Sequence, residues 1–230
     1  MRVVGIDGCR GGWVAVLYDT DGPRWTPRFH PTFVDAISSY PHVSCIGVDM
    51  PIGLVERGWR KCDLEARERL GVRQSSVFNP PDRRLFDIPA HREATARSVE
   101  LERGGISVQT FSILPKIAEV NRAMSPLLQN WIVEVHPEVS FAALAGGPLA
   151  GGKGKSEGFD ERAALLSAGL GIVIPTRRET SARVLEADAD DVLDALVAAW
   201  SAKRMVEGLA ERIPAEPEVD SQGLRIEMVI

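Results

Sequence analysis

Short apolar runs along the chain predict the strands of a β-sheet. Residues 3–6 form an unbroken apolar run, the pattern of a strand that is buried on both faces of a sheet, and two later segments repeat it. We expect strands over residues 2–6, 13–17, 24–29, 44–48 and 131–135. A glycine-rich turn over residues 8–12 joins the first two strands. We expect a mixed five-stranded sheet in which three antiparallel strands are followed by two parallel strands.

Helical periodicity fills most of the chain between and after these strands. We expect helices over residues 32–40, 137–144, 159–167 and 190–207. In the last of these, apolar positions wrap most of the way round the first three turns, which is typical of a buried helix. The order of strands and helices predicts an α/β fold in which helices flank the sheet.

The segment of residues 51–125 differs from its surroundings. It is polar and rich in arginine, it contains the turn sequence Asn79-Pro80-Pro81, and helical patterns occur near residues 63–70, 91–102 and 111–123. We interpret it as a helical insertion between the fourth and fifth strands. Because no internal repeat is visible, we expect residues 1–230 to form a single domain with this insertion.

Two further segments lack apolar periodicity. Residues 146–158 hold six glycines and two lysines, which predicts a mobile loop. Its GGKGKS sequence is no phosphate-binding loop, because Leu149 stands where that motif requires glycine and no strand precedes it. Residues 214–222 are a polar, proline-bearing tail, and residues 224–230 are either a late strand or an ordered tail.

Composition bounds the function. With 230 residues, 44% apolar and 26% charged side chains, the chain is typical of a soluble globular protein. No apolar stretch approaches the roughly 20 residues that cross a bilayer, and no leader precedes the first strand, so we expect no membrane partner and a cytoplasmic location. The net charge of -5 argues against non-specific coating of nucleic acid but leaves room for a local basic groove. Three widely spaced cysteines favour reduced thiols.

Carboxylates stand at the ends of the apolar segments. Asp7 and Asp49 follow the first and fourth strands, and Glu134 lies at the end of the fifth. Carboxyl ends of parallel strands meet at one rim of a sheet, where α/β proteins place their sites. Asp191 and Asp194 are three residues apart on the last helix and share a face, so a docked helix can bring them to the same rim.

Such a cluster requires a counter-charge. Two carboxylates about 4 Å apart repel by roughly 4 kcal/mol at an effective dielectric near 20, and a domain is stable by only about 5 to 15 kcal/mol. An all-oxygen ligand set favours Mg2+ or Mn2+ over zinc. We therefore expect a divalent ion among these carboxylates.

Each acid also has a simpler interpretation. Asp190 or Asp191 alone suits the first turn of a helix, where a carboxylate satisfies free amides. Asp49 can open a turn before Met50 and Pro51. Glu134 can pair with an arginine of the insertion. Asp194 lies inside an apolar helix and is harder to explain in this way.

Four motifs together resemble a known family. They are GIDGCRGGW from Gly5, VDMPIGL from Val48, EVHPEVSF from Glu134 and DDVLDALVAAW from Asp190. Over about residues 3–203 the chain resembles the predicted ribonuclease H-like nuclease family, catalogued as domain of unknown function 429. The resemblance implies a ribonuclease H-like fold with an acid on strand one, an acid after strand four, and an acid or acidic pair on the last helix. Asp7, Asp49, Asp191 and Asp194 fit these places as metal ligands, and Glu134, at the end of strand five, is expected as an additional ligand or substrate contact.

Several polar residues are candidate substrate contacts. They are Arg10, Arg73, Ser75, Ser76, Lys116 and His136. Arg10 lies in the glycine turn beside Asp7, where amides and a guanidinium can cradle phosphate, although a hairpin needs glycines anyway. His136 can act as a base or contact phosphate, or simply end a strand before proline. Residues 57–103 hold 11 Lys or Arg against 8 Asp or Glu, which makes them a candidate substrate-facing surface whose residues also suit a solvated helical face.

Three functions follow, in order of preference. The first is a metal-dependent nuclease or phosphodiesterase, with Asp7, Asp49, Glu134, Asp191 and Asp194 as its catalytic residues and a nucleic acid or nucleotide phosphate as its substrate. The second is a non-catalytic nucleic-acid or nucleotide binding module on the same scaffold. The third, an actin-like phosphotransferase, shares the first-strand aspartate, but such enzymes pair two domains of this kind and 230 residues supply only one.

Overall fold

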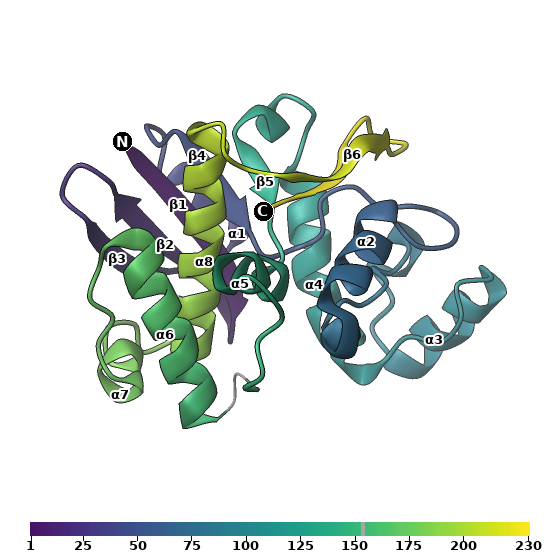
Figure 1. The fold of residues 1–230 in the computed structure, drawn as a ribbon. Coiled ribbons are helices and arrows are strands. Elements are labelled where there is room, and N and C mark those ends of the chain that lie inside the picture. The colour runs from purple at the N-terminus through teal and green to yellow at the C-terminus, as the bar shows by residue number, and fades with distance from the viewer. Residues whose placement is uncertain (153–154) are drawn as a thin grey trace.

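A mixed five-stranded sheet forms the centre of the protein (Figure 1). The computed structural model describes residues 1–152 and 155–230. The strands are β1 (Arg2–Cys9), β2 (Gly12–Asp19), β3 (Arg24–His30), β4 (Cys45–Val48) and β5 (Ile132–Glu134), in the order β3-β2-β1-β4-β5. β1, β2 and β3 pair antiparallel, whereas β4 and β5 run parallel to β1. The predicted mixed sheet and the directions of its strands are confirmed.

The turn between β1 and β2 is shorter than the predicted turn of residues 8–12. The ladder continues until Cys9 lies opposite Gly12, so that only Arg10 and Gly11 connect the strands. Gly11 has a φ of 79°, a conformation that glycine adopts without steric cost. Asp7 is itself a ladder residue, because backbone pairing continues past a side chain that β-strands usually disfavour.

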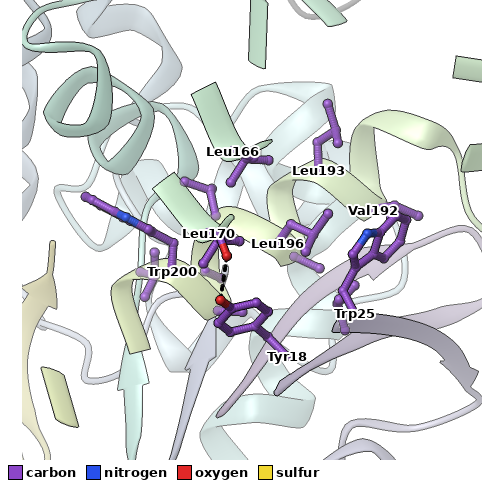
Figure 2. Packing of buried hydrophobic residues seen from close by; sticks show 14 of the residues in the cluster. Tyr18, Trp25, Leu166, Leu170, Val192, Leu193, Leu196 and Trp200 are labelled. Atoms are coloured by element: carbon purple, nitrogen blue, oxygen red, sulfur yellow. Dashed lines mark hydrogen bonds between the residues drawn. The ribbon is translucent and has the colours of Figure 1, made fainter. Parts of the chain in front are cut away.

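One face of the sheet is covered by α8 (Ala189–Val206), with α5 (Pro137–Ala145), α6 (Ser156–Leu170) and α7 (Arg177–Ser181) packed beside it (Figure 1). Tyr18 of β2 crosses this core and donates its hydroxyl to the Leu170 carbonyl at 2.6 Å (Figure 2). α6 begins inside the predicted loop of residues 146–158, and residues 153–154 of that loop lie outside the described part of the structure.

The other face is covered by α1 (Phe33–Ser38) and α4 (Val108–Ala123). As predicted, Thr32 caps α1, and its side chain accepts a hydrogen bond from Asp35 N. Among the described residues, no helix combines the length and apolarity needed to cross a membrane.

The chain between β4 and β5 is helical, as its periodicity predicts. It contains α2 (Lys61–Leu70), η1 (Gly71–Ser76), η2 (Arg83–Leu85), α3 (His91–Glu100), α4 and η3 (Leu128–Asn130). In Figure 1, α2 and α3 lie beyond the β5 edge of the sheet, away from β3. This segment thus extends the molecule on the side where the parallel strands lie.

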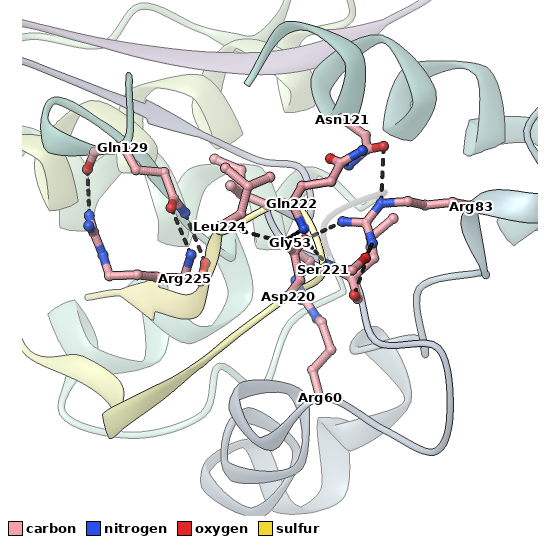
Figure 3. Close-up of polar contacts among 12 residues, drawn as sticks. Gly53, Arg60, Arg83, Asn121, Gln129, Asp220, Ser221, Gln222, Leu224 and Arg225 are labelled. Atoms are coloured by element: carbon pink, nitrogen blue, oxygen red, sulfur yellow. Dashed lines mark hydrogen bonds and ion pairs between the residues drawn. The ribbon is translucent and has the colours of Figure 1, made fainter. Parts of the chain in front are cut away.

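The C-terminal segment is a two-stranded sheet of β6 (Arg212–Val219) and β7 (Arg225–Val229). The polar tail predicted over residues 214–222 is wrong for most of its length, whereas the late strand, one of the two predictions for residues 224–230, is confirmed. Prolines inside β6 hide its strand character in the sequence, and its pairing with β7 is interrupted between Ile213 and Glu218. Asp220, in the turn after β6, accepts hydrogen bonds from Leu54 N at 3.1 Å and from Arg83 (Figure 3). The small sheet thereby holds the segment after β4 in place.

Two glycines allow α8 to lie directly against the sheet. Gly5 and Gly47 are opposite each other in β1 and β4. A Cβ on Gly5 would overlap the Ala195 carbonyl oxygen, and one on Gly47 would overlap that of Ala198. Backbone therefore packs on backbone at the centre of the sheet, which fixes the depth and position of α8.

Candidate metal centre

Three carboxylates from three separate elements meet at the carboxyl end of β1. Asp7, Asp49 and Asp194 each offer an oxygen, and these oxygens lie within 4.8 Å of one another. Asp194 is 2% exposed and Asp7 is 7% exposed, while Asp49 is half-buried. The acids are separated by up to 187 positions in the chain, so only folding brings them together.

Strand register and side-chain alternation explain the convergence. Ile6 lies opposite Val48, and Asp49 N donates to the Ile6 carbonyl at 2.8 Å, so Asp7 and Asp49 are neighbours across the two strands. Residues two apart on a strand face the same side. Asp7 and Asp49 therefore face the side of Gly5 and Gly47, which is the side that α8 covers and where Asp194 lies.

The donor set suits a hard divalent cation. Mg2+ binds oxygen at about 2.0 to 2.1 Å, so two ligands on opposite sides of one ion are about 4.2 Å apart. The spread of 4.8 Å is slightly larger, and small side-chain rotations close it. Without a cation, three carboxylates this close repel strongly in a site that is largely shielded from water. These residues thus fit the group that the sequence predicted.

Asp191 lies one turn before Asp194 and makes a local contact. It is the third residue of a capping box at the start of α8, where its Oδ2 accepts a hydrogen bond from Asp188 N at 3.0 Å. This is the helix-terminal arrangement expected of such an acid. Asp191 is not one of the three carboxylates that lie within 4.8 Å of one another. Its role as a metal ligand stays a prediction.

The thiol of Cys9 shows which charges surround the end of β1. Burial raises the pKa of Cys9, Asp191 and Asp7 also raise it, and Lys116 lowers it, which together bring this pKa to about 11. The two acids and the lysine therefore all act on the same short stretch of backbone. Cys9 is free and buried, and so are Cys45 and Cys62, as predicted for reduced thiols.

Glu134 faces the opposite side of the sheet. It lies opposite Val48, whereas Asp7 and Asp49 have the other parity. Its carboxylate accepts hydrogen bonds from Arg60 at 2.6 and 2.8 Å and from Ile52 N at 2.6 Å. Pairing with an arginine of the segment 51–125, the alternative interpretation of this residue, is confirmed. A role as ligand or substrate contact stays a prediction.

Arg60 is the residue at this position that sequence analysis missed. It is 1% exposed and also binds the carboxylate of Asp63, with contacts of 2.6 and 2.8 Å. Burial raises the pKa of Glu134, while Arg60 counteracts this shift. Cys62, Asp63 and Glu134 also have closely spaced ligand atoms, but the guanidinium already binds both carboxylates. This group is a buried ion network that joins α2 to β5.

Lys116 and Arg10 lie at the β1–β2 turn, which follows Asp7 in the chain. Lys116, on α4, donates to the Gly12 carbonyl and lies 4.8 Å from the ring centre of Trp13. A Cβ on Gly8 would come within 2.6 Å of the Lys116 side chain, so the lysine lies against the residue that follows Asp7. Arg10 is exposed at the tip of the β1–β2 turn. In the predicted amide cradle, Gly8 N already donates to Asp7 Oδ1 at 2.6 Å.

The other candidate substrate contacts form a group at the start of α5. Arg73 is bound to Glu138 at 3.1 Å and to the Gly151 carbonyl at 3.1 Å. Ser75 and Ser76 are exposed in η1, and His136 precedes α5 and lies 3.4 Å from the Ser76 carbonyl. Since His136 follows β5, this group lies at the carboxyl rim of the parallel strands.

The basic segment of residues 57–103 uses most of its guanidinium groups for internal contacts. Arg67 binds the Gln74 and Val77 carbonyls, Arg83 binds Asp220, and Arg103 binds the carbonyls of Gly58 and Pro80. These contacts hold loops together. Most arginines of this segment therefore have structural contacts within the protein.

The chain matches the family model described as "Protein of unknown function (DUF429)" over residues 5–219. This match spans most of the sequence, and the protein belongs to that family. The four motifs that carry the resemblance all lie inside the matched region. No curated protein and no solved structure matches the chain.

Proposed function

We propose that the protein is a metal-dependent nuclease or phosphodiesterase of the ribonuclease H-like type. One observation carries the proposal: Asp7, Asp49 and Asp194 lie within 4.8 Å of one another at the carboxyl end of the parallel strands. The acids occupy the places that the resemblance implies, namely strand one, the end of strand four and the last helix. In this proposal the helical segment between β4 and β5 is an insertion in that fold.

The carboxylates of Asp7, Asp49 and Asp194 would hold Mg2+ or Mn2+. A bound divalent ion lowers the pKa of a water molecule and stabilises the leaving oxygen of a phosphodiester. The protein's own part is positional. Gly8 N fixes the orientation of Asp7, and the packing of α8 on Gly5 and Gly47 sets the depth of Asp194.

Positive groups at the β1–β2 turn and near the start of α5 would orient a phosphate backbone. Lys116 and exposed Arg10 lie on the side of the β1–β2 turn, and Arg73 and His136 lie towards α5. Because the chain as a whole carries a net charge of -5, binding would depend on this local arrangement rather than on a general basic surface.

The decisive experiment incubates the protein with labelled single-stranded, duplex, hybrid and branched nucleic acids in Mn2+. Wild type should cleave at least one of these substrates, and Asp7→Asn should reduce its cleavage by at least 100-fold. Asp87→Asn is the matched control, since Asp87 is exposed and pairs with Arg122 on the surface. Equal cleavage by all three preparations would indicate a contaminant and remove the proposal. Metal-dependent binding of substrate without any cleavage would instead establish a binding module.

A further inference from the structure

A pocket opens at the opposite end of the sheet from the three carboxylates. It has a volume of about 280 Å3 and lies between the ends of β2 and β3 and the connection from α1 to β4. Arg2, at the first position of β1, is part of its lining. Arg2 precedes Asp7 by five residues, which is about 17 Å along a strand. The pocket is therefore separate from the candidate metal centre.

The pocket combines apolar walls with positive groups. Leu17, Tyr40 and Val43 contribute apolar surface. Arg2 and Arg28 contribute guanidinium groups, and His42 contributes an imidazole ring. Among the described residues that line the pocket, none is acidic. Asp19 lies opposite Arg2 in the β1–β2 register, but it has Arg24 as a partner at 3.8 Å. The positive charge of the pocket is thus not neutralised from within its lining.

The wall that contains Tyr40 is supported from behind. His30 is 4% exposed, its Nε2 lies 3.4 Å from the Tyr40 hydroxyl, and its Nδ1 lies 3.5 Å from Ser39 Oγ. The rings of His30 and Tyr40 meet edge to face at 5.8 Å. Arg28 lowers the pKa of Tyr40 against the raising effect of burial, which places its charge close to the ring. The aromatic wall and the guanidinium are therefore held side by side.

We propose that this pocket binds a nucleoside monophosphate, with its phosphate on Arg2 and Arg28 and its base against the apolar walls. Guanidinium groups match phosphate oxygens in a bidentate geometry, and ligand pockets join mainly apolar walls to a few placed polar groups. The volume of about 280 Å3 is just below the usual range of about 300 to 1,000 Å3 for ligand pockets. It accommodates a mononucleotide rather than a dinucleotide.

The test is calorimetric titration of the full chain with AMP in EDTA, so that no metal-dependent binding contributes. Wild type should bind AMP, and Arg2→Gln with Arg28→Gln should weaken binding at least tenfold. Arg92→Gln removes an exposed positive charge on α3 and should leave binding unchanged. Tyr40→Leu should also weaken AMP binding, and circular dichroism establishes that each variant is folded.

Two further titrations separate this proposal from its rivals. Asp7→Asn should bind AMP as wild type does. If Asp7→Asn loses AMP binding while the double arginine variant keeps it, AMP binds at the metal centre and the proposal is overturned. Inorganic phosphate alone should bind at least tenfold more weakly than AMP. Equal binding of phosphate and AMP, or no binding of AMP at millimolar concentration, would also overturn it.

Discussion

Replacing Asp194 by asparagine tests whether the three carboxylates form a cation site. Asn has nearly the same shape as Asp, so the change removes a charge while α8 keeps its packing. In the absence of metal the variant should be more stable than wild type, because repulsion within the cluster is relieved. In the presence of metal the difference in stability between the variant and wild type should become smaller or change sign. The reason is that wild type is stabilised by an ion that the variant binds poorly.

The magnitude follows from the separation of the oxygens. At 4.8 Å and an effective dielectric near 20, each ionised pair repels by about 3.5 kcal/mol. Asp194 takes part in two such pairs, about 7 kcal/mol in all. Proton uptake limits this strain, because protonating an ordinary aspartate at pH 7 costs only about 4 kcal/mol. We therefore expect a stabilisation of about 1 to 4 kcal/mol, or roughly 3 to 12 °C in Tm for a chain of this size.

The assay is thermal unfolding followed by circular dichroism, in EDTA and in Mg2+ or Mn2+. At a metal concentration of about 100 times Kd, wild type should gain about 2.7 kcal/mol, and Asp194→Asn should gain less than half of that. Asp87→Asn serves as the control with an unchanged metal response. A lower Tm for Asp194→Asn in EDTA, together with a metal shift equal to that of wild type, would refute the reasoning.

Three other predictions concern the structure around the site. Gly5→Ala should destabilise the protein by about 3 kcal/mol or more in urea unfolding and abolish the metal-induced rise in Tm, because α8 must move away from the sheet. Gly22 has open space around it, so Gly22→Ala should have neither effect. Equal effects of the two substitutions would contradict this account. Glu134→Gln should cost about 3 to 5 kcal/mol by leaving Arg60 poorly compensated, yet keep the metal-induced rise in Tm; loss of that rise would make Glu134 a ligand. The pKa of the Cys9 thiol is raised from 9.0 to about 11 in the folded protein. As the pH rises, the unfolded chain therefore loses this proton near pH 9, before the folded protein does, and the free energy of unfolding should fall between pH 9 and 11. Urea unfolding at a series of pH values checks this prediction, and Cys9→Ala should show a smaller fall in the free energy of unfolding. If wild type and Cys9→Ala have the same slope between pH 9 and 11, the thiol is not the cause.

Some of the site was accessible from the sequence because it depends on local patterns. Apolar runs marked β1, β4 and β5, and the acids at their ends followed from where each run stops. The periodicity of α8 showed that Asp194 lies inside a buried helix rather than at its end. Side chains alternate along a strand, so the side of the sheet that Glu134 faces follows from its register against Val48. This register is known only from the structure.

Other features depend on contacts that no local pattern records. The bond from Arg60 to Glu134 joins positions 74 residues apart, and arginine in a polar stretch gives no sign of burial. β6 was missed because its prolines weaken the strand signal, while pairing with β7 and packing on the segment after β4 compensate for them. Tertiary contacts overrode local preference at both places.

The sequence alone determined the succession of the five strands of the main sheet along the chain, their directions and the identity of the acids, since hydrophobic periodicity and strand ends are properties of short segments. Only the tertiary structure decided which acids meet. The contact surface at Gly5 and Gly47 sets how closely α8 approaches the sheet, and strand register directs Asp7 and Asp49 towards it while Glu134 faces the other side. Distances between side chains on separate elements are fixed by packing, which depends on residues far apart in the chain.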